Sequence, residues 1–182
     1  MKEIRLHGRG GQGAAKGAEM LTMAFIYDGK YAASFPMYGA ARRGGLVSAF
    51  CRFDEQPVRE KTMIYNPDCL VVFDPLMKDL PEVYEGFKLG GTVILNTAEK
   101  LTQPPHKNVK TLGLIDATRI AAEELGLAAT NTAILAAIAA TTKWVTIEAV
   151  IESFAEYFKG PALDKNIKCA RRGYSETKVI EY

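Results

Sequence analysis

The apolar positions of the chain follow two periods, and their alternation predicts a succession of strands and helices. Residues 3–7 alternate Ile4 and Leu6 with polar neighbours, which predicts a first strand, whereas residues 12–27 place their apolar side chains on one helical stripe. Residues 31–35 predict a second strand that ends at Pro36, and residues 46–53 alternate strongly as a third. A hairpin partner of this third strand is expected at residues 58–63.

Continuous apolar runs appear in the second half of the chain. Residues 69–73 form a run that is typical of a strand buried on both faces of a parallel sheet, and further strands are expected at residues 92–95 and 109–112. Helices are expected at residues 81–87, 117–125, 131–141 and 147–158. Asp116 is the predicted N-cap of the second of these. A charged helical stretch follows at residues 164–172, with Gly173 as its expected C-cap.

This order of elements predicts the α/β class. We expect a three-layer α/β/α domain with a Rossmann-like, doubly wound, mostly parallel sheet and a β-hairpin-like insert. A chain of 182 residues with 48% hydrophobic content fits one such domain. The predicted domain covers residues 1–160, and residues 161–182 form a C-terminal helical tail that packs on the domain or on a partner.

Charge and cysteine usage exclude several classes of function. The chain has 23 basic and 21 acidic residues, a near balance that gives no reason to expect binding to nucleic acid. Cys51, Cys69 and Cys169 lie too far apart for a disulfide framework or a metal or cluster motif, so a reducing cytoplasm is the expected location. No apolar signal segment opens the chain, and its longest apolar stretch is too short for a bilayer, so no membrane association is expected.

A glycine-rich turn between the first strand and the first helix is the main candidate site. Glycines allow positive φ and the close approach of a ligand to backbone N–H groups, and the helix directs its positive end there. The candidate residues for an anion, a cofactor or a partner subunit are Gly8, Arg9, Gly10, Gly11, Gln12 and Gly13. Their spacing meets the dinucleotide fingerprint, but the acidic residue that should end the second strand is missing, since Asp28 precedes that strand in a turn. The alternative that the glycines only permit a tight turn stays open.

The loop at residues 36–45 is the second unusual stretch. Arg42 and Arg43 stand beside two glycines and suit bidentate contact with a carboxylate or phosphate, although an ion-paired or solvated pair is the alternative. Apolar residues in a polar loop favour burial under a partner. The interface candidates are Phe35, Pro36, Met37 and Tyr38. Because both glycine-rich stretches follow strands, we expect them at one edge of the sheet, and we expect the isolated chain to form a homodimer.

The residues alone yield no complete active site. His7 and His106 lie on different predicted elements, and neither pairs with a nucleophile. His7 either positions a group beside the glycine turn or makes a structural hydrogen bond. Asp68 and Asp74 flank the buried strand and each adjoins a proline, which favours turn formation over acid–base work. No catalytic residue and no metal site is therefore assigned.

Several co-linear motifs resemble those of one family, the gamma subunits of 2-oxoacid:ferredoxin oxidoreductases. The chain is also similar to the corresponding domain of single-chain pyruvate:ferredoxin oxidoreductases. The resemblance rests on residues 5–14, 28–32, 35–44, 65–68, 71–75, 165–166 and 173–174. Ala40, Ala41 and Gly45 depart from the pyruvate-type pattern, in which a proline, an acidic residue and an alanine are expected, so the identity of the 2-oxoacid stays open.

The resemblance implies a multi-subunit enzyme. Such a complex decarboxylates a 2-oxoacid on thiamine diphosphate, passes electrons through iron–sulfur clusters to ferredoxin, and transfers the acyl group to coenzyme A. The expected partners are thiamine-binding alpha and beta subunits and a ferredoxin-like cluster subunit, which hold the thiamine diphosphate, the magnesium and the clusters. This chain is expected to bind none of these cofactors alone and to have no turnover by itself. Two roles stay open for the glycine turn with Arg42 and Arg43: to hold the phosphates of coenzyme A in the complex, or to bind a carboxylate of a neighbouring subunit or cap its helix.

Two other classes of function are kept as alternatives. The first is a stand-alone nucleotide- or coenzyme-A-binding α/β protein that acts through the glycine turn. The second is a regulatory or scaffolding module.

Overall fold

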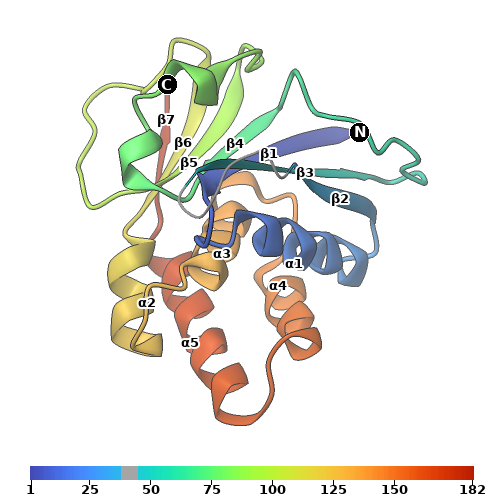
Figure 1. The fold of residues 1–182 in the computed structure, drawn as a ribbon, viewed down its shortest axis with the longest axis vertical. Coiled ribbons are helices and arrows are strands. Elements are labelled where there is room, and N and C mark those ends of the chain that lie inside the picture. Colours follow the sequence, from blue (N-terminus) through green and yellow to red (C-terminus); the bar gives the residue numbers. More distant parts are fainter. Residues whose placement is uncertain (38–44) are drawn as a thin grey trace.

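The fold of the chain, seen in a computed structural model, is built on one mixed sheet of seven strands. The structure describes residues 1–37 and 45–182. The strands are β1 (Lys2–Arg9), β2 (Tyr31–Met37), β3 (Leu46–Asp54), β4 (Cys69–Val72), β5 (Gly91–Asn96), β6 (Val109–Ile115) and β7 (Lys178–Glu181). Their order is β2-β3-β1-β4-β5-β6-β7 (Figure 1). β1, β4, β5 and β6 run parallel to one another, whereas β2 and β3 are antiparallel at one edge and β7 at the other.

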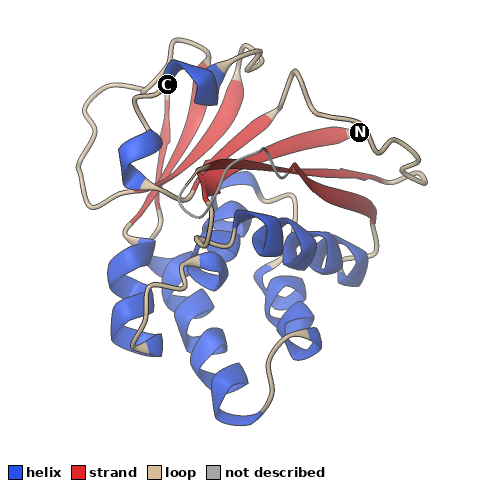
Figure 2. Cartoon of the chain, in the orientation of Figure 1, coloured by secondary structure: helices blue, strands red, loops and turns tan. Residues whose placement is uncertain are grey.

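The α-helices of the described residues all cover the same face of this sheet (Figure 2). They are α1 (Ala14–Tyr27), α2 (Ala117–Leu125), α3 (Asn131–Thr142), α4 (Ile147–Ser153) and α5 (Gly160–Glu176). α3 contacts β5, β6 and each of the other α-helices, which explains why it is apolar on all sides. A short 3-10 helix, η3 (Phe154–Glu156), continues α4. The opposite face carries two further 3-10 helices, η1 (Pro75–Met77) and η2 (Pro81–Tyr84), and their loops.

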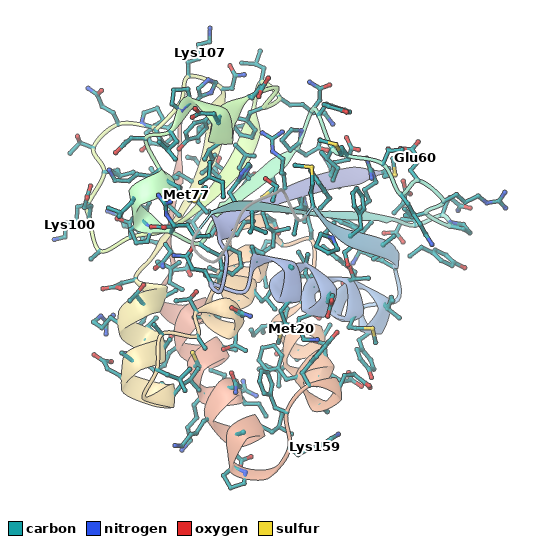
Figure 3. The ribbon with its side chains drawn as sticks, in the orientation of Figure 1. Met20, Glu60, Met77, Lys100, Lys107 and Lys159 are labelled. Carbon is teal, nitrogen blue, oxygen red and sulfur yellow. The ribbon has the colours of Figure 1, made fainter. Side chains whose placement is uncertain are left out.

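The sheet therefore separates two apolar cores. Met20 of α1 belongs to the larger core on the helical face, and Met77 of η1 to the smaller one on the other face (Figure 3). β4 supplies both, since Val71 points to the larger core and Leu70 to the smaller. This confirms that the apolar run at residues 69–73 contains a strand buried on both faces.

The predicted α/β class is confirmed, and the strand expected at residues 46–53 is present as β3, but it pairs with β2 and not with the hairpin partner predicted at residues 58–63. Two details of the expected doubly wound arrangement differ. Three of the six strand pairings are parallel and three antiparallel, because both edges add antiparallel strands. The second face carries 3-10 turns in place of α-helices, because its connecting segments contain Pro75, Pro81, Pro104 and Pro105, which interrupt an α-helical ladder.

Several element boundaries also need correction. β2 continues through Pro36 to Met37, which an edge strand allows because the missing N–H faces no partner. Residues 58–63 form no strand. Gly173 lies inside α5 and is no C-cap: a Cβ there would lie 2.6 Å from the Ala133 carbonyl oxygen, so glycine allows α3 and α5 to pack closely. β7 was not predicted.

The last residues of the chain join the fold through two elements. α5 packs on α3 and α2, and β7 pairs with β6. The division into residues 1–160 and a tail of residues 161–182 stays a prediction. Within the described residues, every helix is too short or too polar to cross a bilayer.

Candidate cofactor and subunit-contact site

The glycine turn joins the end of β1 to the start of α1 at the carboxyl edge of the parallel strands. Gly11 and Gly13 have φ values of 98° and 85°, in the left-handed region that favours glycine. Gly13 is the N-cap of α1; no side chain caps this helix, and its first turn has no acidic residue. The positive end of the α1 dipole is therefore not neutralised by its own first turn.

Contacts inside the turn explain part of its sequence. The Gln12 side chain accepts a hydrogen bond from the Arg9 backbone N–H at 2.6 Å, and the Gln12 N–H donates to the Arg9 carbonyl at 3.0 Å. A Cβ at Gly13 would lie 2.6 Å from Nδ2 of Asn131, so the start of α3 leaves room only for glycine. The reading of the glycines as a tight-turn requirement therefore has structural support, and the first turns of α1 and α3 lie together.

The described ends of the second glycine-rich stretch meet this turn. The Gly10 N–H donates to the Gly45 carbonyl at 2.9 Å, and Arg9 of β1 lies opposite Leu46 of β3. Phe35 stacks at a tilt on Phe50, with 4.9 Å between ring centroids, and Met37 is exposed. Three candidates, Tyr38, Arg42 and Arg43, lie outside the described residues.

Asp74 ties the turn to the end of β4. Its carboxylate accepts hydrogen bonds from Arg9 Nε at 2.7 Å and from the Leu76 N–H at 2.9 Å, so that it caps η1. Burial alone would raise the pKa of Asp74, but the Leu76, Arg9 and Gln12 hydrogen bonds outweigh burial and hold that pKa below its usual range. Asp68 lies at the other end of β4 in ion pairs with Lys2 and Lys88. Each aspartate is thus occupied at its own turn, and the two form no acid–base pair.

His7 makes a structural hydrogen bond. Arg5 Nε donates to His7 Nε2 at 2.9 Å, and Ser48 Oγ lies 3.5 Å from His7 Nδ1. Burial, and next the positive charge of Arg5, lower the pKa of His7 to about 3. The ring is therefore neutral at pH 7 and is a poor proton carrier.

Arg5 and Arg52 lie on the face of the sheet opposite the α-helices, which we call the open face. Their role was not predicted from the sequence. Both are almost fully buried, and together they donate to the carbonyls of four successive residues, 62–65, at 2.5 to 3.5 Å. Arg5 also donates to the carbonyls of Val83 and Glu85 at 3.0 and 2.7 Å. The only available signal was that Arg5 and Arg52 occupy the polar positions of alternating strands.

Asp28, the cysteines and the possible metal ligands form no further site in the described part of the chain. Asp28 caps the far end of α1 and accepts a hydrogen bond from Thr146 Oγ1 at 2.6 Å, so it cannot bind a ribose at the glycine turn. The three cysteines are free and buried, and burial raises the pKa of the Cys51 thiol to about 12. Across residues 1–37 and 45–182, no three His, Cys, Asp or Glu side chains come together as a metal site.

A comparison with known families identifies the chain. The family model described as pyruvate ferredoxin/flavodoxin oxidoreductase matches residues 3–176. The chain belongs to this family. The full-length matches to gamma subunits given next confirm the predicted identity as a gamma subunit of a 2-oxoacid oxidoreductase complex.

Members of the pyruvate ferredoxin/flavodoxin oxidoreductase family match the chain over its full length. The common gamma subunit of pyruvate/ketoisovalerate oxidoreductases from Thermococcus kodakarensis is 48% identical over all of both chains. The gamma subunit of NADH-dependent phenylglyoxylate dehydrogenase from Aromatoleum evansii is 39% identical, with 98% of this chain and 95% of that protein covered. The crystal structure of a pyruvate oxidoreductase subunit from Thermotoga maritima superimposes with a TM-score of 0.86 at 34% identity, covering 99% and 98% of the two chains.

Proposed function

We propose that this chain acts as a positioning subunit of a 2-oxoacid:ferredoxin oxidoreductase and performs no chemistry alone. The observation that carries this proposal is that the polar side chains a catalyst would need are already engaged within the chain. His7, Asp68, Asp74 and the cysteines are each held neutral, ion-paired or buried, so none is poised as a nucleophile or base. Thiamine diphosphate, magnesium and the iron–sulfur clusters are then bound by the alpha, beta and ferredoxin-like subunits. A reducing cytoplasm suits three free thiols.

The test is an assay of the purified chain with pyruvate or 2-oxoglutarate, coenzyme A and a dye acceptor. We expect no turnover from the chain alone and turnover after addition of the partner subunits. Turnover by the chain alone would support the alternative of a stand-alone enzyme and overturn the proposal. Substrate choice is expected to follow the partners, because the Thermococcus kodakarensis relative is named as common to pyruvate and ketoisovalerate enzymes.

Within the complex, we propose that the glycine turn binds the phosphates of coenzyme A together with Arg42 and Arg43. The uncapped start of α1, and the hydrogen bond that joins Gly10 to Gly45, support an anion site at this edge. Charge-assisted contacts of about 1.5–3 kcal/mol each would then contribute to coenzyme A affinity.

Replacement of both arginines, Arg42→Gln/Arg43→Gln, in the assembled complex tests this site. We expect the KM for coenzyme A to rise by at least about tenfold, the equivalent of one lost contact, with the KM for the 2-oxoacid unchanged. A complex that fails to assemble would assign the arginines to the subunit interface instead. Unchanged kinetics would rule out both roles.

The homodimer is a further part of the proposal. Phe35, Pro36, Met37 and Tyr38 form its expected contact, and the exposure of Met37 supports it. Light scattering of the isolated chain should give the mass of a dimer. A monomer at high concentration would contradict it.

A further inference from the structure

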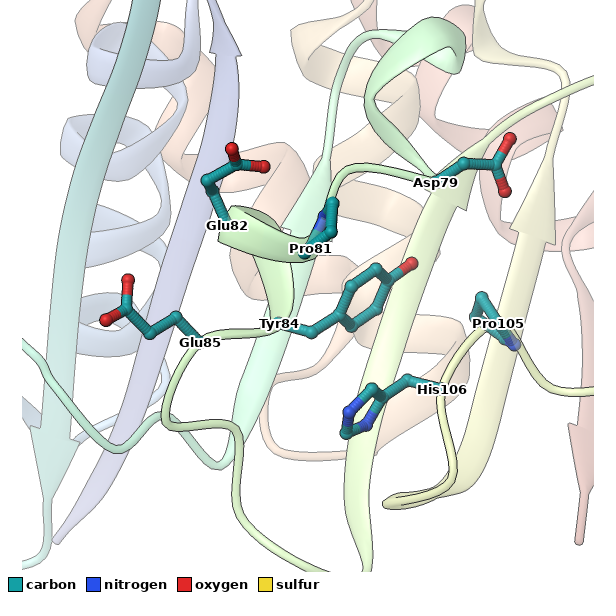
Figure 4. A pocket seen from close by; sticks show the side chains of 7 residues that line it. All are labelled: Asp79, Pro81, Glu82, Tyr84, Glu85, Pro105 and His106. Carbon is teal, nitrogen blue, oxygen red and sulfur yellow. The ribbon is translucent and has the colours of Figure 1, made fainter.

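The 3-10 helix η2 forms a ridge between two cavities on the face of the sheet opposite the α-helices. The first cavity, of about 590 Å³, is lined by Asp79, Pro81, Tyr84, Pro105 and His106 (Figure 4). The second, of about 480 Å³, includes Met37, Met63 and Tyr65. Glu82 and Glu85 line both cavities and stand on the ridge between them.

The wall of the first cavity is formed by the partly exposed ring of His106, which stacks on the buried ring of Tyr84. The rings of Tyr84 and His106 stack with 5.2 Å between centroids and an interplanar angle of 6°. The Tyr84 hydroxyl donates to the Lys78 carbonyl at 2.6 Å, and the Asn108 N–H donates to His106 Nδ1 at 3.2 Å, so both rings are fixed. A flat ring surface of this kind suits the planar guanidinium of an arginine.

The ridge carries exposed negative charge at Glu82 and Glu85. Asp79 is paired with Lys78 at 2.6 Å. Glu82 and Glu85 are exposed, and in the part of the chain that the structure describes neither takes part in a salt bridge. Arg5 lines the second cavity, but its donors are directed to backbone carbonyls and to His7. The Arg5 charge also interacts with Glu85, so that among the described residues Glu82 is the less compensated of these two exposed carboxylates.

The second cavity adds a preformed apolar surface. Met63 is 37% exposed and Tyr65 is 68% exposed, whereas Met37, which also lines this cavity, is assigned to the homodimer contact proposed above. Arg5 and Arg52 hold the backbone of residues 62–65 in place, and Asn66 Nδ2 donates to the Gly86 carbonyl at 3.1 Å. Little ordering of this surface is needed on binding, which lowers the cost of docking a partner.

We propose that this ridge and its two cavities dock a basic segment of a partner subunit. An arginine of that segment lies along the Tyr84–His106 wall and pairs with Glu82 and Glu85, and a neighbouring apolar side chain enters the second cavity beside Met63 and Tyr65. A second copy of this chain, docked ridge to ridge, would bring like charges together, and the charge pattern therefore selects a basic partner. The inference rests on the proposed function, because that function supplies the partner subunits.

The test compares two charge-reversed variants in the complex reconstituted with its partner subunits. Glu82→Lys/Glu85→Lys changes the ridge, and the matched control Glu55→Lys/Glu152→Lys changes the net charge equally at exposed positions elsewhere. Circular dichroism and the melting temperature confirm that each variant folds. We expect the dissociation constant for assembly to rise about 100-fold for the ridge variant and less than about threefold for the control. The milder variant Glu82→Gln/Glu85→Gln should raise this dissociation constant about tenfold, and its assembly should depend less strongly on salt concentration.

Each other outcome overturns the inference. Equal assembly of the ridge variant and the control would show that the ridge faces solvent. Loss of self-association in the ridge variant, with assembly unchanged, would assign the ridge to a second copy. If the unaltered chain fails to assemble with the partner subunits, the proposed function itself fails, and that result differs from selective insensitivity of the ridge.

Discussion

The two faces of the sheet are held by different forces. On the helical face, α3 is buried on all sides, and the larger apolar core joins it to the other helices and to β1, β3, β4 and β5. On the other face over β1 and β3, Arg5 and Arg52 hold irregular segments by hydrogen bonds to their carbonyls. Apolar burial supplies most of the folding free energy, whereas a buried arginine fixes the segments whose carbonyls it contacts and has a desolvation cost. The helical face therefore stabilises the fold, as does the smaller apolar core over β4, β5 and β6, whereas the segments over β1 and β3 are held by the two arginines and are where the contact with partners is proposed.

The largest effect is expected from a cavity in the helical face. Phe154 is fully buried and packs edge-to-face on Phe158, with 6.1 Å between ring centroids. Phe154→Ala should lower the free energy of unfolding by about 3–5 kcal/mol. Leu89→Ala, at an exposed position on a loop before β5, should change it by less than about 0.5 kcal/mol. Urea unfolding measures both, and a loss below 1 kcal/mol for Phe154→Ala, on the order of an exposed site, would contradict the assignment of stability to this core.

A smaller and more local effect is expected on the open face. Arg5→Met leaves carbonyls at residues 64, 65, 83 and 85 without their donor, and we expect a loss of about 2–3 kcal/mol. Hydrogen exchange should accelerate around residues 62–66 and 83–86 while α3 stays protected. Arg59→Met, at an exposed position, is the control. Equal acceleration in α3 would show that the two faces do not separate in this way.

The smallest effect is expected in the pH dependence of stability that His7 causes on the open face. The pKa of His7 is about 3 in the folded chain, against about 6.5 in an unfolded one. Between these values only the unfolded chain binds the proton, so the stability from the neutral ring is complete above about pH 6.5 and is lost as the pH falls toward 3. Lowering the pH from 7 to 4.5 should therefore reduce the free energy of unfolding of the unaltered chain by about 2 kcal/mol more than it reduces that of the variant His7→Gln. An equal loss of stability in the unaltered chain and in His7→Gln would show that the His7 ring is solvated in the folded chain, and would contradict this prediction.

Local signals made part of this structure predictable. Asp116 accepts a hydrogen bond from the Arg119 N–H, and α2 has the predicted bounds, because an N-cap acts within one helical turn. The glycine turn was likewise found from its own residues. Gly173 and β7 were not, because a close helix crossing and an edge strand of four residues depend on segments far away in the chain. The arginine contacts to residues 62–65 and the cavities beside η2 were missed for the same reason. Every residue has a backbone carbonyl, and the sequence does not show which carbonyls accept a hydrogen bond from a distant side chain.

Hydrogen exchange of the chain, free and within the reconstituted complex, tests most directly the claim that the helical face stabilises the fold and that the segments over β1 and β3 meet the partners. Assembly should slow exchange in peptides that contain residues 10–13, 62–66 and 81–86, and leave those of α2, α4 and α5 unchanged. Protection confined to the helices, with the glycine turn and the η2 ridge exchanging as in the free chain, would contradict it.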